Sequence, residues 1–173
     1  MILSDTSLKS LALAGLVAPY ISDNVQGSSI DLTLGSTIKV ESPSGCSNKW
    51  VDQSIVEPYS LAPGEFVLAH TAETIKIPKG CAAMVLLRSS AARAGYEHSL
   101  AGWCDPFFQG ELVLELRNNL RHHRLALQAG MRLCQLIVHQ LDEQAVNHYG
   151  LRGNYQGQTG VTASTNNFSQ IAA

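Results

Sequence analysis

Residues 111–119 read ELVLELRNN, and this stretch indicates the fold class. Leucines stand at alternate positions, whereas the positions between them carry Glu111, Val113, Glu115 and Arg117. Successive side chains of a β-strand point to opposite faces, so the alternation predicts a strand with one apolar face in a core. The other face carries two carboxylates. The sequence therefore raises the question of whether that face is solvated or lines a pocket.

Strand-like patterns recur along much of the chain. They are separated by turn residues such as Pro63-Gly64 and Gln128-Ala129-Gly130, and they occupy residues 28–40, 61–87 and 124–141. Many short strands with regular turn signals are typical of an all-β barrel or jelly roll.

The remaining segments predict little regular structure. A short helix is expected over Thr6–Ala14, and the polar segment Glu41–Gln53 is expected to be a loop. Gly153–Ala173 is rich in Gly, Gln, Asn, Ser and Thr, which is typical of a flexible tail. We therefore expect one domain over residues 1–152, followed by a lid or tail over residues 153–173.

The composition limits the classes of function. The chain has 173 residues and a formal net charge of −2, so it lacks the basic character of a duplex-binding protein, although a few arginines suffice for a small anionic ligand. No apolar run approaches the roughly 18 residues of a membrane span, and the N-terminus lacks a signal-peptide pattern. We expect a cytoplasmic protein whose scattered cysteines are reduced core residues, namely Cys46, Cys81, Cys104 and Cys134.

Residues 87–95, LRSSAARAG, concentrate hydrogen-bond donors. Arg88, Ser89, Ser90 and Arg93 offer two guanidinium groups and two hydroxyls, which are the donors that a polyphosphate needs. The alternative is a helix start with serine caps and solvated arginines.

Residues 97–110, EHSLAGWCDPFFQG, bring aromatic side chains together with a histidine. Trp103, Phe107 and Phe108 are either core residues or the wall of a base-binding pocket, since aromatic faces stack on nucleobases. Trp103 taken alone is expected in the core. His98 is either a titrating group or a hydrogen-bonded structural residue.

The sequence lacks the common hydrolase motifs. The H-x-E and P-C-x-x-C motifs of zinc nucleoside deaminases do not occur, and neither does a G-x-S-x-G elbow. A protein-held metal is not expected. The segment GNYQGQTGVTAS (153–164) supplies Tyr155, Gln156 and Gln158 as potential ligand contacts, or is simply a flexible C-terminus.

Taken in order, these segments resemble the dCTP deaminase branch of the dUTPase-like superfamily. The resemblance covers nearly the whole chain, and its motifs are SSIDLTLG (28–35), PGEFVLAHTAETIKIP (63–78), RSSAARAG (88–95), HSLAGWCDPFFQGELVLELRN (98–118), QAGMRLCQLIV (128–138) and YQGQTGVTAS (155–164). It implies a distorted jelly-roll β-barrel with a short N-terminal helix. It also implies homotrimers with nucleotide sites at subunit interfaces, a tail that closes over the triphosphate, and Mg²⁺ held mainly by phosphate oxygens, without zinc.

The resemblance also implies roles for individual residues. Glu115 would act as the proton shuttle that removes the C4 amine of cytosine. Ser89 and the backbone carbonyl of Ala101 would orient the attacking water, and Arg93 would stabilise the site electrostatically. Asp105 would contact the deoxyribose 3′-hydroxyl and, in members that also split dUTP, activate the hydrolytic water.

Further residues are implied in substrate binding, whereas Glu111 has no implied role and is expected to be solvated. Phosphate oxygens would be held by Arg88, Ser89 and Ser90. The base would pair edge-on with Val113, Leu114 and Glu115. The remaining implied contacts are Gln135, Tyr149, Tyr155 and Gln158.

The chain departs from the family pattern at several positions. Leu87 replaces the usual glycine, and one residue fewer separates Arg93 from His98. Leu100 stands where the family usually carries a threonine before the alanine. The residue associated in the family with feedback regulation by dTTP is therefore missing here. Asn154 replaces a lysine, which removes a charge from triphosphate binding.

The leading hypothesis is zinc-independent deamination of dCTP to dUTP and ammonia. The segment AGWCD (101–105) and Gln135 resemble members that continue to dUMP and diphosphate. A plain dUTPase is disfavoured by Glu115, and a modified cytosine nucleotide is a further candidate substrate. A non-catalytic nucleotide sensor is the alternative from a different class, supported by Leu87 and Asn154.

Overall fold

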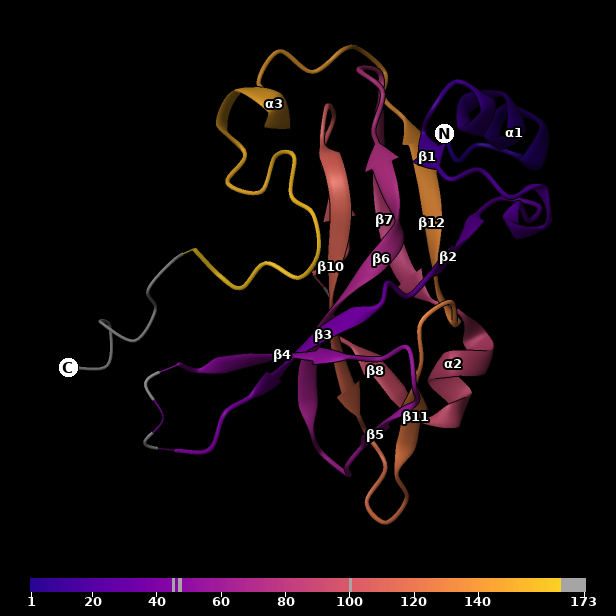
Figure 1. Ribbon diagram of the computed structural model, residues 1–173. Coiled ribbons are helices and arrows are strands. Elements are labelled where there is room, and N and C mark those ends of the chain that lie inside the picture. Colours follow the sequence, from indigo (N-terminus) through magenta and orange to yellow (C-terminus); the bar gives the residue numbers. More distant parts are fainter. Residues whose placement is uncertain (45, 47, 100, 166–173) are drawn as a thin grey trace.

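The computed structural model describes residues 1–44, 46, 48–99 and 101–165, and Figure 1 shows a body built mainly of strands. The helical segments are short: α1 (Asp5–Leu13), η1 (Ser22–Asn24), α2 (Ser89–Ala94) and α3 (Tyr149–Arg152). The strands are β1 (Val17–Ala18), β2 (Ile30–Thr33), β3 (Thr37–Glu41), β4 (Trp50–Ser54), β5 (Tyr59–Leu61), β6 (Phe66–Lys76), β7 (Cys81–Leu87), β8 (Tyr96–His98), β9 (Trp103–Cys104), β10 (Gln109–Asn118), β11 (Leu125–Leu127) and β12 (Arg132–Gln140). The mainly β class and the short N-terminal helix are confirmed.

The described strands form three sheets. A six-stranded sheet has the order β4-β3-β6-β10-β8, with β1 paired to β6, and a four-stranded sheet has the order β2-β12-β7-β9. Strands β11 and β5 pair separately. One core cluster joins the large sheets, because Leu114 of β10 and Leu136 of β12 both belong to it. Burying each such leucine stabilises the fold by about 1.5–3 kcal/mol.

Strand β10 has the alternation that its sequence predicts. Leu112, Leu114 and Leu116 are buried, whereas Glu111 and Glu115 are partly buried on the opposite face. That second face is therefore neither core nor fully solvated.

A β-bulge interrupts the pairing of β10 with β6. Glu111 lies opposite Thr74, but Val113 lies opposite His70, so the register shifts between them. The backbone N–H of Leu112 donates instead to the Thr71 hydroxyl at 2.9 Å. Bulges re-aim side chains, and this one lies beside the partly buried Glu111.

The segment Glu41–Gln53 is not the loop expected from its composition. Its last residues belong to β4, which pairs with β3 to make a hairpin that projects from the body in Figure 1. Most of β4 is exposed, so it lacks the apolar alternation by which a strand is recognised. Trp50 packs on Phe66 of β6, with ring centroids 6.1 Å apart, and this tertiary contact supports the strand.

The cysteines are free, and Cys81, Cys104 and Cys134 are buried as expected. Cys46 is exposed, so the core prediction was wrong for this residue, which lies in the projecting hairpin. Within the described ranges, no helix is long and apolar enough to cross a bilayer.

Candidate active site

A cavity of about 520 Å³ opens beside the polar face of β10. Its walls combine strands from the centre of the chain with the C-terminal segment. The lining residues are Lys49, Trp50, Phe66, Leu68, Ala101, Trp103, Cys104, Asp105, Phe108, Leu112, Val113, Glu115, Tyr149, Tyr155, Gln158, Thr162 and Ser164. The volume suits a small-molecule ligand.

Glu115 is the partly buried carboxylate of this cavity. Its side chain is 27% exposed, and its Oε2 atom has no hydrogen-bond partner within the described chain. Burial raises the pKa of Glu115 above its ordinary value because the charged form loses hydration. A carboxyl group in this state can accept a proton and return it at a pH closer to neutrality.

His98 of β8 lies next to Glu115 across the strand pair. Its Nδ1 atom is 3.7 Å from Glu115 Oε2, and neither ring nitrogen has a hydrogen-bond partner among the described residues. Burial lowers the pKa of His98, which favours the neutral ring.

Trp103 and Asp105 form a second polar element of the wall. The indole Nε1–H of Trp103 donates to Asp105 Oδ1 at 3.0 Å. Trp103 is 55% exposed, so the expectation that it lies in the core was wrong. Phe108, in contrast, is 5% exposed and belongs to the core as well as to the cavity wall.

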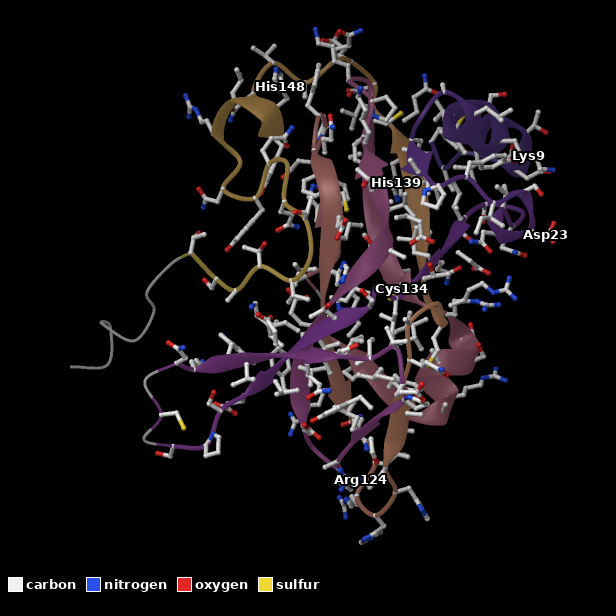
Figure 2. All side chains as sticks on the ribbon, viewed as in Figure 1. Lys9, Asp23, Arg124, Cys134, His139 and His148 are labelled. Carbon is white, nitrogen blue, oxygen red and sulfur yellow. The ribbon has the colours of Figure 1, made fainter. Side chains whose placement is uncertain are left out.

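The C-terminal segment closes one side of the cavity. Tyr149 of α3 packs edge-on against Phe108, and its hydroxyl accepts the backbone N–H of Tyr155 at 3.1 Å. His148, labelled in Figure 2, precedes α3, and its ring stacks on Phe107 with centroids 4.1 Å apart. These aromatic contacts bring Tyr155 and the residues after it toward β10.

Glu111 is not solvated, which corrects the expectation from the sequence. Its carboxylate Oε2 lies 2.7 Å from His70 Nδ1 and 2.6 Å from the backbone N–H of Gly160. The glutamate thus joins β6, β10 and the C-terminal segment. The sequence could not show this, because His70 and Gly160 are 41 and 49 positions away.

The edge of β10 is open between two covered stretches. Strand β8 pairs with residues 116–118, and the C-terminal segment bonds to Gln109 and Glu111. Between residues 111 and 116, no other described strand pairs with this edge of β10. The Ser99 N–H does donate a hydrogen bond to the Glu115 carbonyl. Val113 lines the cavity here, whereas the side chain of Leu114 points into the core.

The donors at the start of α2 lie outside the cavity. Ser89, Ser90 and Arg93 are exposed, and Arg88 Nε lies 3.3 Å from Asp31 Oδ1. Figure 1 shows α2 on the other side of the molecule from α3 and the segment that follows it. A single chain therefore does not bring these donors to Glu115.

Some further expected positions lie away from the cavity. Gln135 of β12 accepts the Ser29 hydroxyl at 3.1 Å and donates to the Leu87 carbonyl at 3.3 Å. Asn154 is exposed, and Leu100 lies outside the described residues.

Sequence reasoning missed Lys49, Trp50, Phe66 and Leu68, which form one wall. The first two lie where a loop was expected, so the sequence offered no reason to place them at a site. No three His, Cys, Asp or Glu side chains within the described ranges gather as a metal cluster.

Comparisons with known proteins identify the family of the chain. A family model described as dCTP deaminase-like matches residues 2–141. The "dCTP deaminase, dUMP-forming" of Aquifex aeolicus (strain VF5) is 39% identical over 172 residues, covering 95% of this chain and 94% of the relative. The "dCTP deaminase" of Natronomonas pharaonis is 39% identical over 186 residues, which cover 95% of this chain and 94% of the relative.

A solved structure supports the fold. The 2′-deoxycytidine 5′-triphosphate deaminase from Agrobacterium tumefaciens matches with a TM-score of 0.66 at 22% identity, over 79% of this chain and 48% of that one. The chain therefore has the jelly-roll fold of that deaminase. Within that class, the chain belongs to the dCTP deaminase family.

Proposed function

We propose that this protein deaminates dCTP by hydrolysis without zinc, forming dUTP and ammonia. The observation that carries the proposal is the partly buried Glu115, whose pKa is raised by burial, at the open edge of β10. The family membership and the names of the relatives support the substrate class.

In the proposed reaction, Glu115 takes a proton from water as the water oxygen bonds to C4 of cytosine. That proton passes to N3 as the C4=N3 double bond opens. The proton of the new C4 hydroxyl then passes through Glu115 to the amine, so that the C–N bond breaks, the C4 carbonyl forms and ammonia leaves. Val113 supports the base along the open edge of β10, and backbone groups at Leu114 and Glu115 pair with it. Ala101, which lines the same cavity, offers its carbonyl to the attacking water.

A second candidate continues from dUTP to dUMP and diphosphate. The hydrogen bond from Trp103 to Asp105 favours it, because it fixes a carboxylate in the wall of the same cavity. Asp105 would activate a water that attacks the α-phosphorus, with diphosphate as the leaving group. Several relatives carry the name "dCTP deaminase, dUMP-forming".

The site is proposed to be completed by a second subunit of a homotrimer. Arg88, Ser89, Ser90 and Arg93 supply polyphosphate donors but do not line their own chain's cavity. A neighbouring copy that places its α2 at the mouth of the cavity would hold the phosphates, with Ser89 and Arg93 beside the reacting base. Tyr149, Tyr155 and Gln158 would complete the contacts within the cavity, whereas Gln135, which bonds to the Leu87 carbonyl just before α2, would come with the neighbouring copy. Magnesium would arrive as part of the nucleotide substrate.

The first experiment incubates the protein with dCTP and Mg²⁺, follows ammonia, and separates the nucleotides. Ammonia with accumulating dUTP supports the deaminase, and ammonia with dUMP and diphosphate supports the coupled reaction. Glu115→Gln should lose ammonia release by about 10²- to 10⁴-fold. Release of diphosphate from dUTP without release of ammonia from dCTP would overturn the proposal. If neither product forms, a modified cytosine nucleotide as substrate, or a non-catalytic nucleotide sensor, would be favoured.

Mixing two inactive variants tests the subunit proposal. Ser89→Ala and Glu115→Gln each disable one half of the site, so co-assembled trimers should regain activity at interfaces that carry neither change. The control is each variant co-assembled with itself. If mixing restores nothing although the trimers form, the site lies within one chain.

A further inference from the structure

The C-terminal segment 155–160 lies along the first half of β10 and is hydrogen-bonded to it. The N–H of Gly157 donates to the Gln109 carbonyl at 2.7 Å, and the N–H of Glu111 donates to the Gln158 carbonyl at 3.0 Å. The side-chain amide of Gln158 donates back to the Glu111 carbonyl at 2.7 Å. The backbone of this segment is therefore fixed to the strand that carries Glu115.

The close approach depends on a glycine in β10. Gly110 has a φ of +151°, and a Cβ added there would lie 2.9 Å from the Gln158 carbonyl oxygen and 3.0 Å from its nitrogen. Any larger residue at position 110 would push the segment away. The lack of a side chain at Gly110 of β10 therefore provides the space in which the C-terminal segment lies.

The carboxylate of Glu111 makes a further contact with the C-terminal segment. Oε2 of Glu111 accepts hydrogen bonds from His70 Nδ1–H at 2.7 Å and from the Gly160 N–H at 2.6 Å. A carboxylate oxygen accepts hydrogen bonds, so the His70 tautomer that pairs with it is the one that carries a proton on Nδ1. Hydrogen bonds to a charged acceptor are stronger than neutral ones, and the 19% exposure of the Glu111 side chain limits competition from water.

The histidine is itself fixed. His70 is 8% exposed, and its ring occupies the space that a side chain at Gly35 would need. The Gly35 N–H also donates to the His70 carbonyl at 2.8 Å. His70 therefore presents Nδ1 to Glu111 from a rigid position in β6.

We propose that His70 and Glu111 are positioning residues, which hold segment 155–160 over the cavity before a nucleotide binds. Tyr155 and Gln158 line the cavity, so the pair acts on substrate binding through them. The polar face of β10 thus has two parts: Glu111 holds the segment, whereas Glu115 faces the cavity. The effect on kinetics rests on the proposed deamination, but the effect on the segment does not.

Hydrogen–deuterium exchange on the full-length protein without nucleotide tests the proposal directly. His70→Leu removes the donor, and we expect the amides of segment 155–160 to exchange about tenfold faster or more. His70→Asn places an amide N–H near the position of Nδ1, so it should restore most of the protection. His122→Leu, at an exposed histidine, is the control.

Peptides from β7 and β12 report whether each variant is folded. If His70→Leu fails to fold, Glu111→Gln decides, because it keeps the size but loses the charge and should speed exchange several-fold. Unchanged exchange of the segment in a folded His70→Leu or Glu111→Gln protein would overturn the proposal. So would a His70→Asn protein that exchanges as fast as His70→Leu.

Steady-state kinetics supply the second readout. In His70→Leu, KM for dCTP should rise about tenfold with a smaller change in kcat, because the segment binds substrate without performing the chemistry. A fall in kcat at constant KM would assign His70 a different role. If the wild type releases no ammonia, the proposed function fails while the exchange experiment still decides the positioning role.

Discussion

The imidazole Nδ1 of His98 lies 3.7 Å from Oε2 of Glu115, and within the described part of the chain neither atom has a hydrogen-bond partner. Burial changes the two pKa values in opposite directions: it raises the pKa of Glu115 and lowers that of His98. Both shifts favour the neutral form of the group. Ionising either Glu115 or His98 inside the fold is therefore unfavourable in free energy. Such shifted pKa values are typical of sites that transfer protons.

Glu115→Gln should stabilise the protein increasingly as pH rises. The pKa of Glu115 is higher in the folded than in the unfolded chain, so its contribution to stability is full below the unfolded pKa and is lost as pH rises through the folded value. The amide avoids that loss, and we expect a gain of about 1 kcal/mol at neutral pH. Urea unfolding at about pH 4 and pH 7.5 measures it.

Glu143→Gln, at an exposed glutamate, is the control for this prediction and should show no such pH dependence. Both variants need the same protein concentration, because the proposed trimer would contribute to the apparent stability. An equal stability difference between Glu115→Gln and wild type at both pH values would contradict the prediction.

His98→Leu should weaken catalysis without weakening the fold at acidic pH. Leucine is apolar, so it should raise the pKa of Glu115 further and move the acid limb of the kcat/KM profile to higher pH. The pKa of His98 is lowered in the fold, so its contribution to stability is present above the unfolded value near 6.5 and is lost as pH falls. Leucine does not titrate, so the variant lacks this loss of stability at acidic pH.

The measurements for His98→Leu are a pH–rate profile of ammonia release and urea unfolding below and above about pH 6.5. We expect activity at neutral pH to fall about tenfold, at the lower end of what a proton-transfer site loses on perturbation. An unchanged acid limb would show that His98 does not affect the titration of Glu115.

Trp103→Phe should separate the two proposed reactions. Phenylalanine keeps an aromatic wall but cannot donate to Asp105, and a hydrogen bond to a charged group contributes about 1.5–3 kcal/mol. Formation of diphosphate from dUTP should slow about tenfold or more, whereas ammonia release from dCTP changes less. Trp50→Phe, in the opposite wall, is the control, and parallel losses of both activities would refute the separate role of Asp105.

Gly153→Ala should displace the C-terminal segment. A Cβ at this position would overlap the ring of Tyr149, whose hydroxyl holds the backbone of Tyr155. We expect KM for the nucleotide to rise several-fold to tenfold, with the core fold intact. Gly80→Ala is the control, because a Cβ there meets nothing within 4 Å. Equal KM values for the two variants would show that Tyr149 can move without affecting the site.

Much of the fold could be predicted from short sequence patterns. The alternation in β10, the short helix α1 and the turn residues depend on local backbone geometry, which is readable from neighbouring residues. The hairpin of β3 and β4 could not be predicted this way, since β4 is mostly exposed and is defined by its partner strand and by the contact of Trp50 with Phe66.

The candidate site was only partly predictable. Glu115, Ala101, Asp105 and Tyr155, which the resemblance named as site residues, line one cavity. The separation of α2 from that cavity depends on the packing of whole elements, so no motif reveals it. Trp103 was assigned to the core because aromatic residues are usually buried, whereas here its indole reaches Asp105 at the surface.

The sequence alone determined that β10 has one leucine face and one polar face, because side chains alternate along any strand. It also placed Glu111 and Glu115 on the same face. Only the tertiary structure decided that the two glutamates differ. A bulge lies beside Glu111, where His70 and Gly160 reach its carboxylate. Glu115 is partly buried next to His98, and its Oε2 has no hydrogen-bond partner among the residues that the structure describes. The period of a strand is fixed by covalent geometry, but the partners of each side chain depend on contacts between distant parts of the chain.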